Sequence, residues 1–256
     1  LDAGGGDPLH ALNIGAVLPP LAIGDKTTAA ALPLTGAAPT PVLANTVAAL
    51  GATDPHDTPA MAMVTASYVA TTAVHTALQP AITAEDSPEG AQHKGGTNAL
   101  ADQLDVVARC IAARVPTRVY CVQLDGFDTH ADERGTQQRL LTTFDTAVTG
   151  FLNQVASYPQ GRNVVLMAYS EFGRRVMANA SNGTDHGTAG PVFIAGDSVK
   201  GGFYGEDPSL TDLDDGDLKA STDFRDIYYD LLAHTLHADP EPVIGTGRRG
   251  IGFLAD

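Results

Sequence analysis

Two short motifs in this chain each bring an aspartate and a histidine together. Residues 126–130 read Gly-Phe-Asp-Thr-His, and residues 183–187 read Gly-Thr-Asp-His-Gly. Carboxylate and imidazole groups are the ligands that zinc, manganese and similar divalent ions take in proteins. We therefore predict a divalent metal site, with zinc, manganese, calcium or magnesium as the ion. The predicted ligands from these motifs are Asp128, His130, Asp185 and His186.

The same motifs also fit simple chain reversals, because aspartate next to glycine is a common turn former. Two observations favour the metal. Each motif follows a predicted strand, directly or after a loop, and ligands of α/β proteins gather at the carboxyl ends of strands. In an extended loop, Asp128 and His130 share a face and reach one ion. Adjacent residues such as Asp185 and His186 point oppositely, so they contact two ions, or one ion if the turn is tight.

A third motif, residues 170–175, reads Ser-Glu-Phe-Gly-Arg-Arg and also follows a predicted strand. Glu171 is a further candidate metal ligand. Arg174 or Arg175 is suited to hold a phosphate or sulfate ester, because a guanidinium binds such anions with two parallel hydrogen bonds. The alternative is a helix start, with Ser170 as the N-cap and the arginines on a solvated face.

Composition limits the possible partners. The chain has 256 residues, a formal net charge of −15 and 15 basic residues. It has no basic stripe of the kind that nucleic acids or anionic membranes require. No apolar stretch is long enough for a transmembrane span. The acidic stretch 207–217 suits either calcium or a solvated loop, and we favour the loop because its spacing fits no EF-hand.

The elements that must position these motifs alternate between strands and helices. Residues 117–124, 163–169 and 191–195 are rich in apolar and β-branched residues, which predicts buried strands. Helices are predicted over 58–79, from Thr97 onward with Leu100, Leu104 and Val107 on one face, along the stripe from Leu141 to Val155, and over 222–237. This alternation predicts an α/β fold: a doubly wound, mostly parallel sheet flanked by helices.

The chain divides by composition into two parts. Residues 1–57 are rich in Ala, Pro and Gly, and we predict an extended segment that wraps the body, with a short strand within residues 11–23. Residues 58–256 form the predicted α/β metal-site domain. Cys110 and Cys121 lie in a helix pattern and a strand pattern, which favours two buried free thiols.

Taken in order, the three motifs and Thr222-Asp223-Phe224-Arg225 resemble those of domain-of-unknown-function family 1501, over roughly residues 93–237. These exported bacterial proteins are grouped with the alkaline phosphatase and sulfatase superfamily. The resemblance implies an alkaline-phosphatase-like fold, incomplete in this chain, whose Asp and His residues hold divalent ions. It also implies a hydroxyl or modified-cysteine nucleophile, for which Ser170 and Thr129 are the candidates within this chain.

The resemblance further implies export, often through a twin-arginine signal, to the cell envelope, the periplasm or the medium. We expect this chain to be the C-terminal part of a longer precursor, whose missing N-terminal part is a possible partner. The expected function is hydrolysis of a phosphate or sulfate ester by a metal-dependent enzyme. The alternative is a secreted, non-catalytic scaffold or binding protein that retains a hydrolase-like fold.

Overall fold

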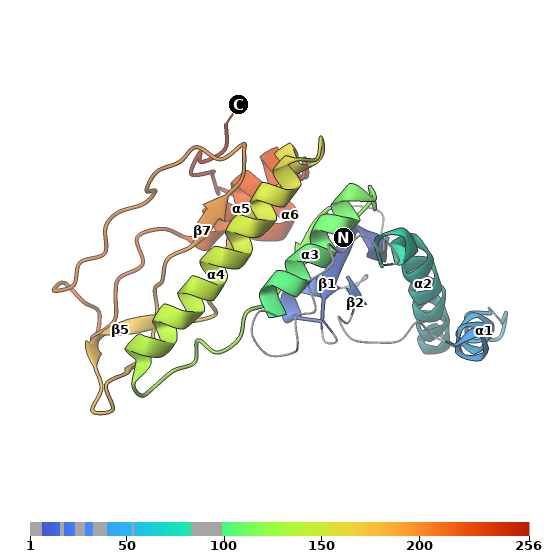
Figure 1. Ribbon diagram of the computed structural model, residues 1–256, viewed down its shortest axis with the longest axis horizontal. Helices are drawn as coiled ribbons and strands as arrows, with labels where there is room; N and C mark the ends of the chain where they lie inside the picture. The colour runs from blue at the N-terminus through green and yellow to red at the C-terminus, as the bar shows by residue number, and fades with distance from the viewer. Residues whose placement is uncertain are drawn as a thin grey trace. The chain divides into compact units, whose positions relative to one another are not determined.

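The chain is a mixed α/β protein with a small parallel sheet flanked by helices. The computed structural model describes residues 7–15, 18–23, 29–32, 40–52, 54–82 and 99–255 (Figure 1). It divides into two compact units, residues 1–123 and residues 124–256. Each unit is described here by itself.

The first unit is built on the parallel sheet. Strand β1 (Ala11–Ile14) pairs in parallel with β2 (Ala30–Leu32) on one side and with β3 (Val119–Cys121) on the other. All four residues of β1 are buried, as expected for a central strand covered on both faces. Two short 3-10 turns, η2 (Pro8–His10) and η3 (Pro20–Ala22), precede and follow β1.

Three described helices accompany this sheet: α1 (Pro41–Leu50), α2 (Pro59–Ile82) and α3 (Ala99–Ala112). The apolar face predicted for α3 is confirmed, because Leu100, Leu104 and Val107 are buried. Thr97, the predicted N-cap of this helix, lies outside the described residues.

The prediction that residues 1–57 are extended is wrong for α1. The hydroxyl of Thr40 accepts a hydrogen bond from the backbone N–H of Leu43, and Pro41 occupies the first helical position. Both features start helices, because they remove backbone donors that have no partner inside the helix. Helix α2 continues through Pro80 to Ile82, three residues beyond the end predicted at residue 79.

The second unit begins with the long helix α4 (Glu133–Ala156) and contains two antiparallel strand pairs. Strand β4 (Leu166–Ala168) pairs with β7 (Phe193–Ala195), and β5 (Gly173–Ala178) forms a hairpin with β6 (Thr184–Gly187). The remaining described elements are η4 (Gly161–Asn163), α5 (Phe224–Asp230), the π-helical turn η5 (Leu231–Thr235) and α6 (Glu241–Ile244).

Two sequence-based expectations for this unit are wrong. The strands predicted over 163–169 and 191–195 pair antiparallel rather than parallel, because the chain between them forms a hairpin instead of the helical crossover that parallel strands need. The helix start at Ser170 is absent, since the strand β5 follows it from Gly173.

The core of the second unit lies between the β4–β7 pair and α5. Ile227, Phe253 and Leu254 are buried there and pack against Met167 and Ile194 from the two strands. The helix predicted over 222–237 is divided into α5 and η5, and in α5 Ile227 is buried while Phe224 is exposed. The apolar stripe of α4 is confirmed only in its second half, where Phe151 and Val155 are buried.

Among the helices that the structure describes, none is both long enough and apolar enough to cross a membrane. The acidic stretch 207–217 is mostly exposed and contains a tight turn in which Asp214 and Asp217 exchange backbone hydrogen bonds.

Candidate metal centre

The first Asp-His motif lies on the loop that leads into α4. Asp128 and His130 are two residues apart, and a 3.1 Å hydrogen bond joins His130 Nε2 to Asp128 Oδ1. The two side chains therefore point to the same place, as the spacing predicted for an extended loop. Asp132, the N-cap of α4, has a left-handed backbone conformation (φ 43°) that turns the chain from this loop into the helix.

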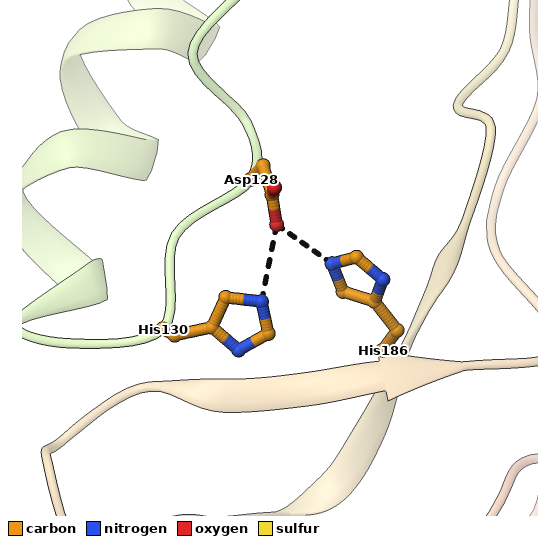
Figure 2. A group of neighbouring side chains, drawn as sticks. All are labelled: Asp128, His130 and His186. Carbon is orange, nitrogen blue, oxygen red and sulfur yellow. Dashed lines mark hydrogen bonds and ion pairs between the residues drawn. The ribbon is translucent and has the colours of Figure 1, made fainter.

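The second motif brings His186 to the same carboxylate. His186 lies on β6, 58 residues further along the chain, and its Nε2 is 2.8 Å from Asp128 Oδ1. Figure 2 shows Asp128 between the two imidazole rings, with both hydrogen bonds ending on one carboxylate oxygen. One donor atom from each of Asp128, His130 and His186 lies within 4.8 Å of the others, so the described residues include a possible metal-binding triad.

The electrostatics of the triad favour the ionised aspartate. The hydrogen bond from His186, followed by the one from His130, holds the pKa of the Asp128 carboxyl below its usual value. All three side chains are exposed. The carboxylate is therefore ionised and accessible to an ion from the solvent.

Asp185 lies beside the triad and faces the other nitrogen of His130. His130 Nδ1 is 3.5 Å from Asp185 Oδ1, whereas His130 Nε2 points to Asp128. A hydrogen bond from Asn179, together with His130 and the charge of Arg175, lowers the pKa of Asp185. The structure thus brings together all four Asp and His residues of the two motifs, with Asp185 next to His130 but outside the triad.

An aromatic ring packs against the triad. Phe172 stacks on the His186 imidazole, with ring centroids 3.8 Å apart and planes 7° from parallel. The guanidinium of Arg174 lies 5.1 Å from the centre of the same phenyl ring. Because the ring covers one face of the imidazole, Phe172 restricts the orientation of His186.

Arg174 is turned toward the protein's own backbone. Its Nη1 donates to the carbonyls of Thr129 and Thr184, both at 2.6 Å, and its Nη2 donates to the carbonyl of Phe127 at 2.5 Å. Its Nε is 3.6 Å from the carboxylate of Glu133. This side chain therefore joins the loop of the first motif to the strand of the second.

Arg175, the next residue of β5, is in a different situation. Its side chain is 42% exposed and lies 3.6 Å from Asp217, and its charge acts on Asp185. Of the two arginines considered for an anion, Arg175 is the one whose guanidinium remains accessible next to the motif residues.

The other predicted site residues lie around this group. Ser170 and Glu171 are exposed, in the connection between β4 and β5, and Glu171 is not part of the triad. The Thr129 hydroxyl accepts hydrogen bonds from Gln137 and Arg174.

Sequence reasoning missed three residues that support the centre: Asn179, Glu133 and Phe172. Asn179 donates to the carbonyl of His130 and to the carboxylate of Asp185. Glu133 accepts hydrogen bonds from the backbone N–H and the hydroxyl of Thr184, both at 2.7 Å. The sequence signal that could have found them is their position. Phe172 lies inside the third motif, and Glu133 and Asn179 lie within a few residues of the first and second motifs.

Comparison with known proteins finds one relationship. No curated protein and no solved structure matches the chain. A family model described as "Protein of unknown function (DUF1501)" matches residues 20–248, which include every residue of the centre. The match extends well beyond the motifs themselves, over most of the chain. The chain therefore belongs to the DUF1501 family.

Proposed function

We propose that this protein is a metal-dependent hydrolase of phosphate or sulfate esters. The observation that carries the proposal is that the imidazoles of His130 and His186 both lie at one carboxylate oxygen of Asp128. His186 reaches this place from a separate motif, 58 residues further along the chain. Carboxylate and imidazole groups gathered in this way are the ligands that divalent ions take in proteins. The neighbouring cationic Arg175 adds a group that suits an anionic substrate.

The donor set fits a transition metal. One carboxylate oxygen and two imidazole nitrogens suit zinc, manganese or iron, whereas calcium and magnesium prefer oxygen ligands only. When bound, such an ion polarises an ester oxygen and lowers the pKa of a bound water. The exposed Asp128 leaves room for a substrate or water beside the three donors.

Arg175 is our candidate for binding the ester's anionic oxygens. Its guanidinium has N–H donors in the planar arrangement that matches a phosphate or sulfate group. Arg174 is less suited to this role, because its N–H groups already bind three backbone carbonyls. Glu171 and Ser170 stay predictions, as a further ligand and a nucleophile, from their place in the motif that also carries both arginines.

Asp185 is our candidate for orienting the imidazole of His130 in the metal centre. A carboxylate on the second nitrogen of a ligating imidazole fixes the tautomer and makes the first nitrogen a better ligand. The 3.5 Å separation between Asp185 Oδ1 and His130 Nδ1 supports such a role for Asp185. We therefore propose that Asp185 orients His130, while Asp128, His130 and His186 bind the ion.

The wider setting of the proposal comes from the family resemblance. We propose that the protein has a doubly wound, alkaline-phosphatase-like fold and acts outside the cytoplasm after twin-arginine export. The sequence motifs shared with that family support both statements. Fractionation of cells that produce the protein tests the location.

One observation favours the alternative, a binding protein without catalytic activity. All three donors of the triad are exposed, and an exposed site loses the water exclusion that strengthens catalytic electrostatics. Such a protein would bind the metal and an anionic partner but would not turn over an ester.

The test begins with the metal. Zinc and manganese binding to the purified protein is measured by calorimetry, for the wild type and for His186→Ala, with His234→Ala as the matched control on an exposed histidine. The proposal requires binding that His186→Ala removes and His234→Ala retains. Turnover of aryl phosphate and aryl sulfate esters by the metal-loaded protein then supports hydrolysis. Metal binding without turnover supports the alternative, and the absence of metal binding overturns the hydrolase and leaves the non-catalytic scaffold.

A further inference from the structure

We propose that Arg174 and Glu133 are positioning residues of the metal centre, which hold the first motif's loop and the strand β6 in the register that brings the donors together. This inference deepens the proposed function and rests on it. Neither residue points a donor atom at the triad. Both act on the backbone that carries it.

Arg174 contacts the chain immediately before three of the four motif residues. The carbonyls that it binds belong to Phe127, Thr129 and Thr184, which directly precede Asp128, His130 and Asp185. Arg174 is also the strand partner of His186 in the β5–β6 hairpin. Arg174 is therefore linked to the backbone at all four positions, through its guanidinium at three of them and through strand pairing at the fourth.

Glu133 provides the second connection. It is the first residue of α4, and its carboxylate accepts both the backbone N–H and the hydroxyl of Thr184. In the other direction, the backbone N–H of Glu133 donates to the carbonyl of Asn182 in the hairpin turn. The start of the helix and the hairpin are thus bound to each other from both sides.

Burial and charge make these bonds strong and selective. The side chains of Glu133 and Arg174 are 13% and 21% exposed, and hydrogen bonds to charged groups in such sites are stronger than those between neutral groups. The Glu133 carboxylate also offsets the charge of the guanidinium. The nearby donors can therefore bind a cation without uncompensated repulsion from Arg174.

A substitution at Thr184 tests the inference with little risk to the fold. Thr184→Val removes the hydroxyl that donates to Glu133 and keeps the shape of the side chain, whereas Thr184→Ser retains the hydroxyl. Removing a group that orients metal ligands typically weakens metal affinity by about 10–100-fold. We expect zinc affinity to fall by about 10-fold in Thr184→Val and to recover in Thr184→Ser.

Arg174→Lys is the second variant, with Arg139→Lys as its control. Lysine keeps the charge but cannot bind three carbonyls in the planar arrangement of a guanidinium. Arg139 lies exposed on α4 and donates to Thr136. We expect zinc affinity to fall by roughly 10–100-fold in Arg174→Lys and to stay unchanged in Arg139→Lys.

The readouts separate positioning from simple stabilisation. For each variant, zinc affinity is measured by calorimetry and the unfolding of the metal-free protein by urea. A purely structural role predicts lower urea midpoints with wild-type zinc affinity in the folded protein, and that result overturns the inference alone. Wild-type protein that binds neither zinc nor manganese overturns the proposed function together with the inference. Weaker zinc binding in folded Thr184→Val and folded Arg174→Lys, with zinc affinity close to wild type in Thr184→Ser, supports the inference.

Discussion

Gly183 lies directly against the backbone of His130, so closely that a Cβ at residue 183 would fall 2.4 Å from the His130 carbonyl carbon. A real Cβ does not approach a backbone carbon to that distance, and a backbone atom cannot rotate away as a side chain does. The two motifs can meet only because residue 183 has no side chain.

Gly183→Ala is therefore expected to separate the two motifs. The added methyl group must push the His130 backbone away, which moves the imidazole from Asp128 and His186. We expect zinc affinity to fall by at least about 10-fold, as measured by calorimetry.

Gly201→Ala is the matched control for this change. A Cβ at Gly201 meets no atom within 4 Å, so zinc affinity should stay at the wild-type value. Equal zinc affinity in the two alanine variants would show that the contact between Gly183 and His130 has no bearing on the centre.

Substitution of Asp185 separates an orienting carboxylate from a ligating one. If Asp185 only orients His130, then Asp185→Asn retains zinc with an affinity reduced by about 10-fold, because three donors remain. Loss of zinc as complete as in Asp128→Asn would instead make Asp185 a ligand, as the sequence alone predicted. Asp197→Asn, at an exposed aspartate, serves as the control.

Substitution of Arg175 tests the binding of the anionic substrate. Arg175→Gln removes the accessible guanidinium and leaves the triad in place, so we expect the KM for an aryl phosphate or sulfate to rise by roughly 10-fold. The kcat should change little, because uniform binding contributes to KM alone. An unchanged KM, equal to that of the exposed control Arg162→Gln, would remove Arg175 from the substrate site.

The centre was predictable from sequence because its donors lie in short motifs whose residue types are chemically distinctive. Asp128, His130 and His186 were all named from their types and spacing, and the structure brings them together. The relation between Asp185 and His130 was not predictable in the same way. Whether adjacent residues on β6 serve one ion or two depends on the hairpin register, which arises from pairing with β5.

The supporting residues depend on tertiary structure and so leave little trace in sequence. Arg174 had the residue type of an anion-binding group, and only the positions of Phe127, Thr129 and Thr184 show that it binds carbonyls. The strand pairing of β4 with β7 was mispredicted for a related reason. Apolar runs indicate burial, but the connection between them decides between parallel and antiparallel.

Alkaline pH provides a test of the first unit that is independent of the metal. Burial raises the pKa of the Cys110 thiol from 9.0 to about 11, and burial also raises the pKa values of Tyr120 and Cys121 on β3. Above about pH 9, the unfolded chain therefore loses the two thiol protons, and above about pH 10 the tyrosine proton, while the folded chain retains them. The unfolded state then binds fewer protons, so stability is full below about pH 9 and declines as the pH rises.

We expect the free energy of unfolding in urea to fall by roughly 1–2 kcal/mol through Cys110 between about pH 8 and about pH 10.5. In Cys110→Ala, the lost packing lowers stability by the same amount at every pH, whereas the decline with rising pH should become shallower. The comparison of slopes isolates the thiol from the other groups that titrate in this range. Parallel slopes for the wild type and Cys110→Ala would mean that the Cys110 thiol ionises as readily in the folded chain as in the unfolded one.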